Sequence, residues 1–264
     1  MATTRNRQEI EKAEHRESID AKAVSPITDY DNEVALGNIA GAKRVLVSGS
    51  NLNLGSTEEL ISEVSGMYQF LTTATQLNLV STDVNDIAGG TGAQSVLLEY
   101  LDANEDEQTE VIALNGTIPV QTVANVFRIN SMAVFAVGSS NEHLGSITIY
   151  DGANILGLIK PNQFRLRQAI YSVPRNKVAL FRKVIIAAGK NDEVTLYFRG
   201  VIRPIHNGNQ LFNVSFAYQN TIDIVNQLPA SFPAGTDINV NAIKTGSAGT
   251  GRISIAFELE VRDL

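Results

Sequence analysis

The sequence contains no cysteine and no tryptophan, and only 3 of its 264 residues are histidine. Without cysteine, neither a disulfide framework nor a thiolate metal site can form. The start of the chain lacks the apolar core of a signal peptide, and no apolar run approaches the length that spans a bilayer. We therefore expect a protein that is made and kept in a cytosol-like compartment and that has no membrane partner.

Aromatic residues make up only 6% of the chain. This scarcity weakens a carbohydrate-binding interpretation, because sugar-binding sandwich folds stack sugar rings on exposed aromatic side chains. The net charge of −7 has the same sign as nucleic acid and anionic lipid, so neither is expected as a main partner. Hydrophobic residues at 44% provide enough apolar material for the two domains that 264 residues suggest.

Alternating apolar and polar residues are the main pattern of the chain. Between Gly251 and Val261, five apolar residues occupy every second position, which is typical of a strand with one buried face. Similar segments recur about every ten residues from residue 42 onward, with turn signals such as Asp151-Gly152 between them. This pattern predicts an all-β protein of two antiparallel β-sandwich domains of the jelly-roll or immunoglobulin-like kind.

Two segments are expected to depart from simple strands. Ser56–Val64 predicts a short helix, with Ser56 as its N-cap and Glu59 at the capping-box position. Residues Val126–Gly138 predict a broken, largely buried pair of strands. We place the domains at residues 26–160, which include the helix, and at residues 161–264.

Residues 1–25 differ from the rest of the chain. Positive and negative charges balance in this arm, and several pairs lie four positions apart, so a helix would bring them together. Its apolar residues are too few to bury a large helix face. Two interpretations follow: a disordered tail, or an arm that becomes ordered against a neighbouring subunit or partner.

The residue types that catalysis or metal binding needs are present but not grouped. His15, His143 and His206 lie in three separate segments and lack ligand spacing, so we expect them to be exposed to solvent. The glycine-rich run at residues 89–92 lacks the Gly-Lys-Ser/Thr sequence of a phosphate-binding loop. No Gly-x-Ser-x-Gly turn occurs. We predict no catalytic residue, no cofactor and no metal site.

The acidic turn after residue 101 comes closest to a metal site. Asp102, Asn104 and Asp106 have the alternate spacing of a calcium loop. However, Glu107 stands where such a loop needs glycine, and Ala113 stands where it needs the closing glutamate. These two positions exclude a calcium-binding hand, which leaves a solvated hairpin tip or an irregular calcium site between subunits.

Two groups of segments resemble a family of uncharacterised virion proteins of tailed bacteriophages. One group comprises Tyr171–Arg199, Leu211–Ala217 and Phe232–Ala242 with the closing strand, and the other comprises Ser48–Leu60 and Gly90–Asp102. The resemblance covers most of residues 35–264 and omits the arm. It implies a structural component of the virion, on the head, neck or tail.

Together these observations predict a bacteriophage structural protein that is synthesised in the host bacterial cytoplasm. It would act as a capsid decoration (cement) protein or a neck or tail accessory protein, through contacts with other virion proteins and with copies of itself. A receptor- or glycan-binding module on the particle surface is the alternative. The candidate docking residues of the arm are Arg5, Arg7, Glu9, Glu11, Lys12, Arg16, Asp20 and Lys22, and the candidate lateral-contact residues are Asp83, Asp86, Asp102 and Asp106.

Overall fold

The computed structural model describes residues 30–189, 192–203, 210–218, 221–225, 230–246 and 249–264, with only the backbone for 210–218 and 221–225. Residues 1–43 and 44–264 form separate units. In the described part of the first unit, α2 (Tyr30–Ala35) is followed by Gly37, whose φ of 77° ends the helix. Asn38 Nδ2 donates a hydrogen bond of 2.7 Å to Glu33. None of the described helices is long and apolar enough to cross a membrane.

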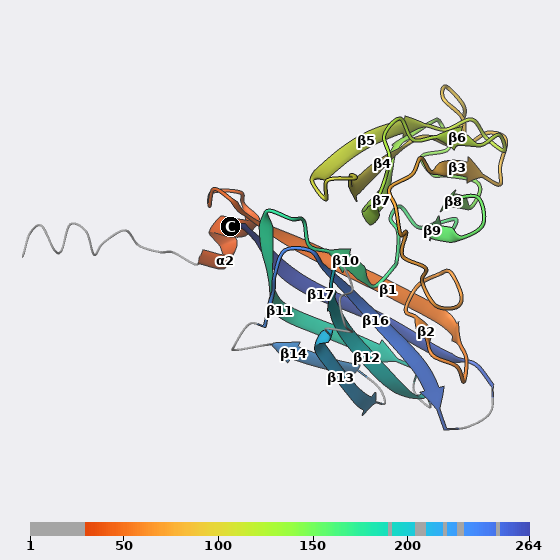
Figure 1. Ribbon diagram of the computed structural model, residues 1–264. Coiled ribbons are helices and arrows are strands. Elements are labelled where there is room, and N and C mark those ends of the chain that lie inside the picture. Colours follow the sequence, from red (N-terminus) through yellow and green to blue (C-terminus); the bar gives the residue numbers. More distant parts are fainter. Residues whose placement is uncertain (1–29, 190–191, 204–209, 219–220, 226–229, 247–248) are drawn as a thin grey trace, which may run out of the picture. The chain divides into compact units, whose positions relative to one another are not determined.

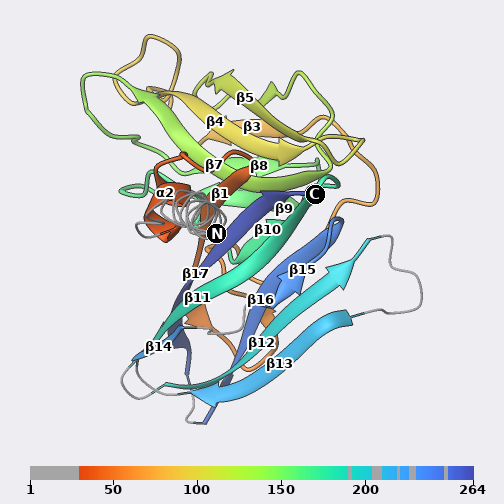
Figure 2. The ribbon, with the colours of Figure 1, turned by 90° about the vertical axis from the view of Figure 1, so that its left-hand side faces the viewer.

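The second unit contains four β-sheets, of which two share one core (Figures 1 and 2). We call these two sheets and their core the body. The first sheet has the order β1 (Ala42–Leu54), β17 (Gly251–Asp263), β11 (Lys177–Ala188) and β14 (Thr221–Val225), with β15 (Ser231–Phe232) beside β11. The second has the order β10 (Ile170–Ser172), β16 (Thr236–Thr245), β12 (Glu193–Ile202) and β13 (Gln210–Tyr218), with β2 (Glu59–Leu60) beside β16.

The other two sheets share a second core, and we call them the lobe. One has the order β6 (Val120–Gln121), β3 (Asn78–Ser81), β8 (Ile147–Tyr150) and β9 (Ile155–Ile159). The other has the order β5 (Glu107–Ala113), β4 (Ala93–Leu101) and β7 (Arg128–Val137). Neighbouring strands in both sheets pair antiparallel.

The predicted all-β, antiparallel character is therefore confirmed, whereas the sheets do not clearly form two sandwich domains. The expected division near residue 160 also differs from the distribution of the core residues. Val47, Leu54 and Ile61 precede residue 160, yet they pack in the body core with residues of β11, β12, β16 and β17. The lobe is thus an insertion in the chain of the body, between β2 and β10.

Strand β17 shows why alternation predicted the fold. Ile253, Ile255, Phe257, Leu259 and Val261 are all buried in the body core. Directly opposite Phe257 and Leu259 stand Val184 and Phe181 of β11. Five large apolar side chains on one face of one strand remove a large apolar area from water, at about 25 cal/mol per Å².

The helix predicted at Ser56–Val64 is wrong, because the segment instead contains β2. Leu60 stands opposite Asn241 of β16, and both Leu60 and Ile61 are fully buried. The Glu59 carboxylate accepts hydrogen bonds from the backbone N–H groups of Gly55 (2.7 Å) and Gly66 (3.1 Å) instead of closing a capping box. Burial and strand pairing therefore override a weak helical preference.

The strand pair predicted at Val126–Gly138 is also wrong. A single ten-residue strand, β7, occupies most of this segment. Its pairing with β4 is irregular at three places, including one between Ser95 and Val96. These irregularities, which are typical of β-bulges, interrupt the alternation that the sequence pattern relies on.

Candidate assembly surfaces and the joint between body and lobe

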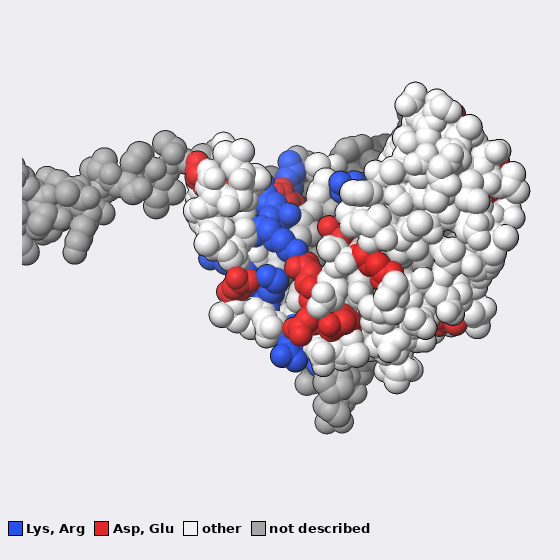
Figure 3. Space-filling view, turned by 90° about the horizontal axis from the view of Figure 1, so that it is seen from above, with Lys and Arg blue, Asp and Glu red and all other residues white. Residues whose placement is uncertain are grey.

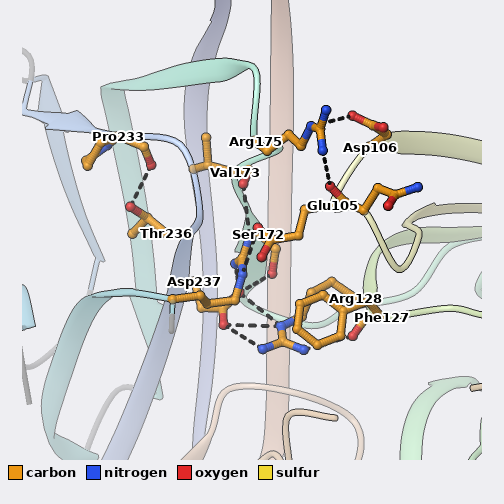
Figure 4. Close-up of polar contacts among 12 residues, drawn as sticks. Glu105, Asp106, Phe127, Arg128, Ser172, Val173, Arg175, Pro233, Thr236 and Asp237 are labelled. Atoms are coloured by element: carbon orange, nitrogen blue, oxygen red, sulfur yellow. Dashed lines mark hydrogen bonds and ion pairs between the residues drawn. The ribbon is translucent and has the colours of Figure 1, made fainter. Parts of the chain in front are cut away.

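Buried ion pairs join the body to the lobe (Figure 4). Arg128 begins β7 of the lobe and Asp237 lies in β16 of the body, and each is only 6% exposed. Arg128 Nε lies 3.1 Å from both carboxylate oxygens of Asp237, and Nη2 lies 3.1 Å from Oδ2. Because both groups are out of water, Arg128 depends on Asp237 for compensation of its charge.

The remaining groups of the Arg128 guanidinium also have partners. Nη1 donates to the carbonyl oxygens of Leu71 (2.8 Å) and Phe127 (2.9 Å). The guanidinium lies over two aromatic rings, 3.9 Å from the ring centre of Phe127 and 5.0 Å from that of Phe70. Three separate segments of the chain therefore hold this guanidinium in place.

A second arginine completes the joint. Arg203 donates to Asp237 and, through Nη2 at 2.8 Å, to Glu105 in the turn between β4 and β5. Ser172 is the third residue that donates to Asp237, through Oγ at 2.6 Å. Two arginines face two carboxylates, so the charges cancel. A satisfied buried network of this kind favours one orientation of the lobe on the body.

A neighbouring pair of hydrogen bonds acts in the same way. Asn130 of β7 donates through Nδ2 to the Ser172 carbonyl oxygen (2.9 Å) and accepts from the Ser172 N–H (2.8 Å). This side chain therefore pairs with the backbone of β10 as another strand would. The joint consists of residues far apart in the chain, and no local sequence pattern indicates it.

The structure separates the four candidate lateral-contact residues into different roles. Asp83 and Asp102 stabilise turns, since each accepts hydrogen bonds from nearby backbone N–H groups, of Asn85 and Asn104 respectively. Asp106 forms an exposed ion pair with Arg175 of the body. The candidate arm residues, Arg5, Arg7, Glu9, Glu11, Lys12, Arg16, Asp20 and Lys22, lie outside the described residues.

Asp86 is not available for lateral contacts, because its side chain is completely buried. Its carboxylate accepts four hydrogen bonds, from Ser81 Oγ (2.6 Å) and from the N–H groups of Ala93 (2.7 Å), Leu144 (2.9 Å) and Gly145 (2.8 Å). Burial alone would raise the pKa of this carboxyl, but the four hydrogen bonds outweigh it and lower the pKa below its ordinary value. Asp86 therefore holds two loops of the lobe together.

His143 is also placed differently from the expectation. It is buried, with Nδ1 2.8 Å from the carbonyl oxygen of Gly145 and Nε2 2.5 Å from that of Gln163. His15 and His206 lie outside the described residues. Within the described part of the chain, no three His, Cys, Asp or Glu side chains are grouped so that they could hold a metal ion.

The surface of the lobe is rich in exposed apolar side chains. Seven large ones are exposed there, namely Val84, Val111, Ile118, Val123, Phe135, Ile155 and Phe164. The region of the lobe seen in Figure 3 carries few charged side chains. Exposed apolar side chains in a region with little charge are candidates for contact with other proteins.

Comparisons with known proteins give no family for this chain. No protein-family model matches it, and no curated protein matches it. It is weakly similar to a structure of infectious bursal disease virus Gt strain, with 9% identity, coverage of 84% of this chain and 72% of that chain, and a TM-score of 0.23. It is also weakly similar to a crystal structure of the infectious bursal disease virus VP2 subviral particle. Here the identity is 10%, the match covers 89% of this chain and 77% of that chain, and the TM-score is 0.23. Both neighbours are viral, with nothing specific to tailed bacteriophages, and such low TM-scores carry no argument about function.

Proposed function

We propose that the protein is a non-enzymatic structural component of a bacteriophage virion, where it joins other virion proteins and copies of itself. The observation that carries this proposal is the concentration of exposed apolar side chains on the lobe. Side chains of this kind lose unfavourable contact with water when another protein covers them. The sequence resemblance to phage virion proteins supports the same role.

The joint between body and lobe supports the proposal from a second direction. A subunit that is repeated in an assembly must present its contact surfaces in a constant relative geometry. The Arg128–Asp237 pair, with Arg203 and Glu105, gives the lobe a defined attachment to the body. In this account each pair of sheets acts as a β-sandwich, and the lobe is the contact module.

The arm, residues 1–25, supplies the second contact in this proposal. It would dock on a neighbouring virion protein, while the lobe makes contacts between copies. Many modest contacts repeated around a shell or collar hold an assembly together without a single strong site. This account fits a capsid decoration protein or a neck or tail accessory protein, made in the host bacterial cytoplasm.

Immunogold labelling of purified particles tests the role. Antibodies raised against the body and lobe should decorate intact particles at regular positions, and unlabelled particles would contradict the proposal. A variant lacking residues 1–24 should keep the circular dichroism spectrum of the full chain but fail to enter particles. Normal entry of this variant would exclude docking through the arm. A glycan array with the purified protein tests the alternative, because a structural subunit should bind none of the glycans.

A further inference from the structure

The outer side of the sheet β5-β4-β7 carries a row of apolar residues. Leu97 of β4 stands directly opposite Val111 of β5 and Ala133 of β7, and Ala133 stands opposite Arg165. Directly opposite residues in antiparallel strands point to the same side of a sheet. The other side of the sheet is the lobe core, formed here by Val96, Leu98, Ile112 and Met132, all buried. We call the outer side the lobe face.

The apolar row of the lobe face is accessible to a partner. Val111 is 52% exposed, and Leu97 and Ala133 are each partly exposed. Phe135, two residues beyond Ala133 on β7, is 62% exposed. Apolar side chains at the centre of a contact stabilise the complex because they leave water. Protein interfaces usually have such an apolar centre, surrounded by a polar rim.

Two exposed charges of opposite sign accompany this row. Glu99 follows Leu97 by two positions and so lies on the lobe face, opposite Ser131, and Arg165 lies at the far edge. Within the described part of the chain, neither side chain makes an ion pair or a hydrogen bond. Strand β7 lies between them, and two strand spacings amount to about 10 Å. Therefore the two charges do not compensate each other within one copy.

We propose that the lobe face binds the lobe face of a second copy around a two-fold axis. This arrangement places Arg165 of each copy opposite Glu99 of the other, with the apolar row packed between the two ion pairs. A two-fold contact forms every interaction twice, so each favourable contact counts twice in the binding free energy of the dimer. Complementary charges also fix the register of the two copies. The inference rests on the proposed function and names the surface through which copies join.

Analytical ultracentrifugation of the full-length chain tests the apolar part of the interface. The protein should sediment as a concentration-dependent dimer, and Val111→Glu should raise the dissociation constant of the dimer at least tenfold because it buries an unpaired charge. Ile155→Glu is the matched control: Ile155 is 49% exposed but lies on β9, in the other sheet of the lobe. It should leave the dissociation constant unchanged. A monomeric wild-type protein at high concentration, or equal effects of both variants, would overturn the proposal.

Charge reversal tests the predicted pairing of the two copies. Glu99→Arg and Arg165→Glu should each weaken the dimer, because each places like charges opposite one another. The double variant should recover dimerisation, since every pair is again of opposite sign; failure to recover would exclude this arrangement. If the protein is monomeric in solution yet present in particles, only this interface is wrong. If it dimerises but is absent from particles, the proposed function is wrong instead.

Discussion

Arg128 Nε lies 3.1 Å from each carboxylate oxygen of Asp237, although the two residues are 109 positions apart in the chain. One lies in the lobe and the other in the body, and both are buried. A buried pair of this kind contributes little net stability compared with apolar residues of the same shape, but the loss of one partner is costly. The pair therefore specifies how the lobe attaches to the body more than it adds to the total stability.

Asp237→Asn should lower the free energy of unfolding by about 3–5 kcal/mol, because it removes the carboxylate that compensates the buried guanidinium of Arg128 and leaves Arg203 with Glu105 alone among its described ion-pair partners. Urea denaturation followed by circular dichroism measures this loss. The matched control is Asp263→Asn, which breaks the ion pair with Lys177 at a carboxylate that is 60% exposed. Its effect should stay below about 1 kcal/mol. Equal losses in the two variants would contradict a special role for the joint.

Asp86→Asn should destabilise the lobe by about 1–3 kcal/mol, since an amide cannot accept all four hydrogen bonds that the carboxylate accepts. Chemical denaturation at neutral pH measures this effect. Asp83→Asn is the control, because Asp83 lies in the same loop but is only partly buried. A smaller effect for Asp86→Asn than for Asp83→Asn would contradict the assignment of Asp86 as the residue that holds the loops.

The same carboxyl predicts a dependence on pH. The pKa of Asp86 in the folded protein lies below its ordinary value of 3.8. Its contribution to stability is therefore fully present above pH 3.8 and is lost as the pH falls through the pKa of the folded state. The difference in unfolding free energy between the wild type and Asp86→Asn should be constant from neutral pH to about pH 5 and should shrink below about pH 4. A constant difference down to pH 3 would contradict the lowered pKa.

Tyr171→Phe should leave stability unchanged or raise it by up to about 1 kcal/mol. Tyr171 is buried in the body core, and its hydroxyl forms no hydrogen bond with any described group. Burial also raises the pKa of this hydroxyl, with smaller contributions from Glu107 and Glu99. Removing a buried polar atom that has no partner removes the cost of its desolvation. A clear loss of stability in thermal unfolding would show that the hydroxyl has a partner.

Local patterns predicted much of the fold. The alternation in β4 and β17, and the Asp151-Gly152 turn between β8 and β9, depend on neighbouring residues and could be read directly from the sequence. The residues that join the lobe to the body could not. The chain returns to the body after the lobe, and only this return brings together Arg128, Asp237 and Arg203. No spacing in the sequence indicates that these residues meet.

The site predictions differ from the structure for a related reason. Acidic residues in a loop look alike in sequence, whether they face solvent, as in a hairpin tip, or point inward, as Asp86 does. Asp86 is distinguished by the N–H groups of Leu144 and Gly145, more than fifty residues away, which point at its carboxylate. The lobe face has a weaker local signal. In the apolar–polar alternation of their strands, Leu97 and Val111 occupy positions where polar residues are expected. An apolar residue at such a position indicates a contact surface.

The most direct test of the structural role is the copy number of the protein in purified particles. Quantitative mass spectrometry of gradient-purified virions, washed at high salt to remove adsorbed proteins, gives its ratio to the other particle proteins. A structural subunit should be present at a constant, stoichiometric copy number before and after the wash. Absence from the particles, or a ratio that falls with washing, would contradict the account.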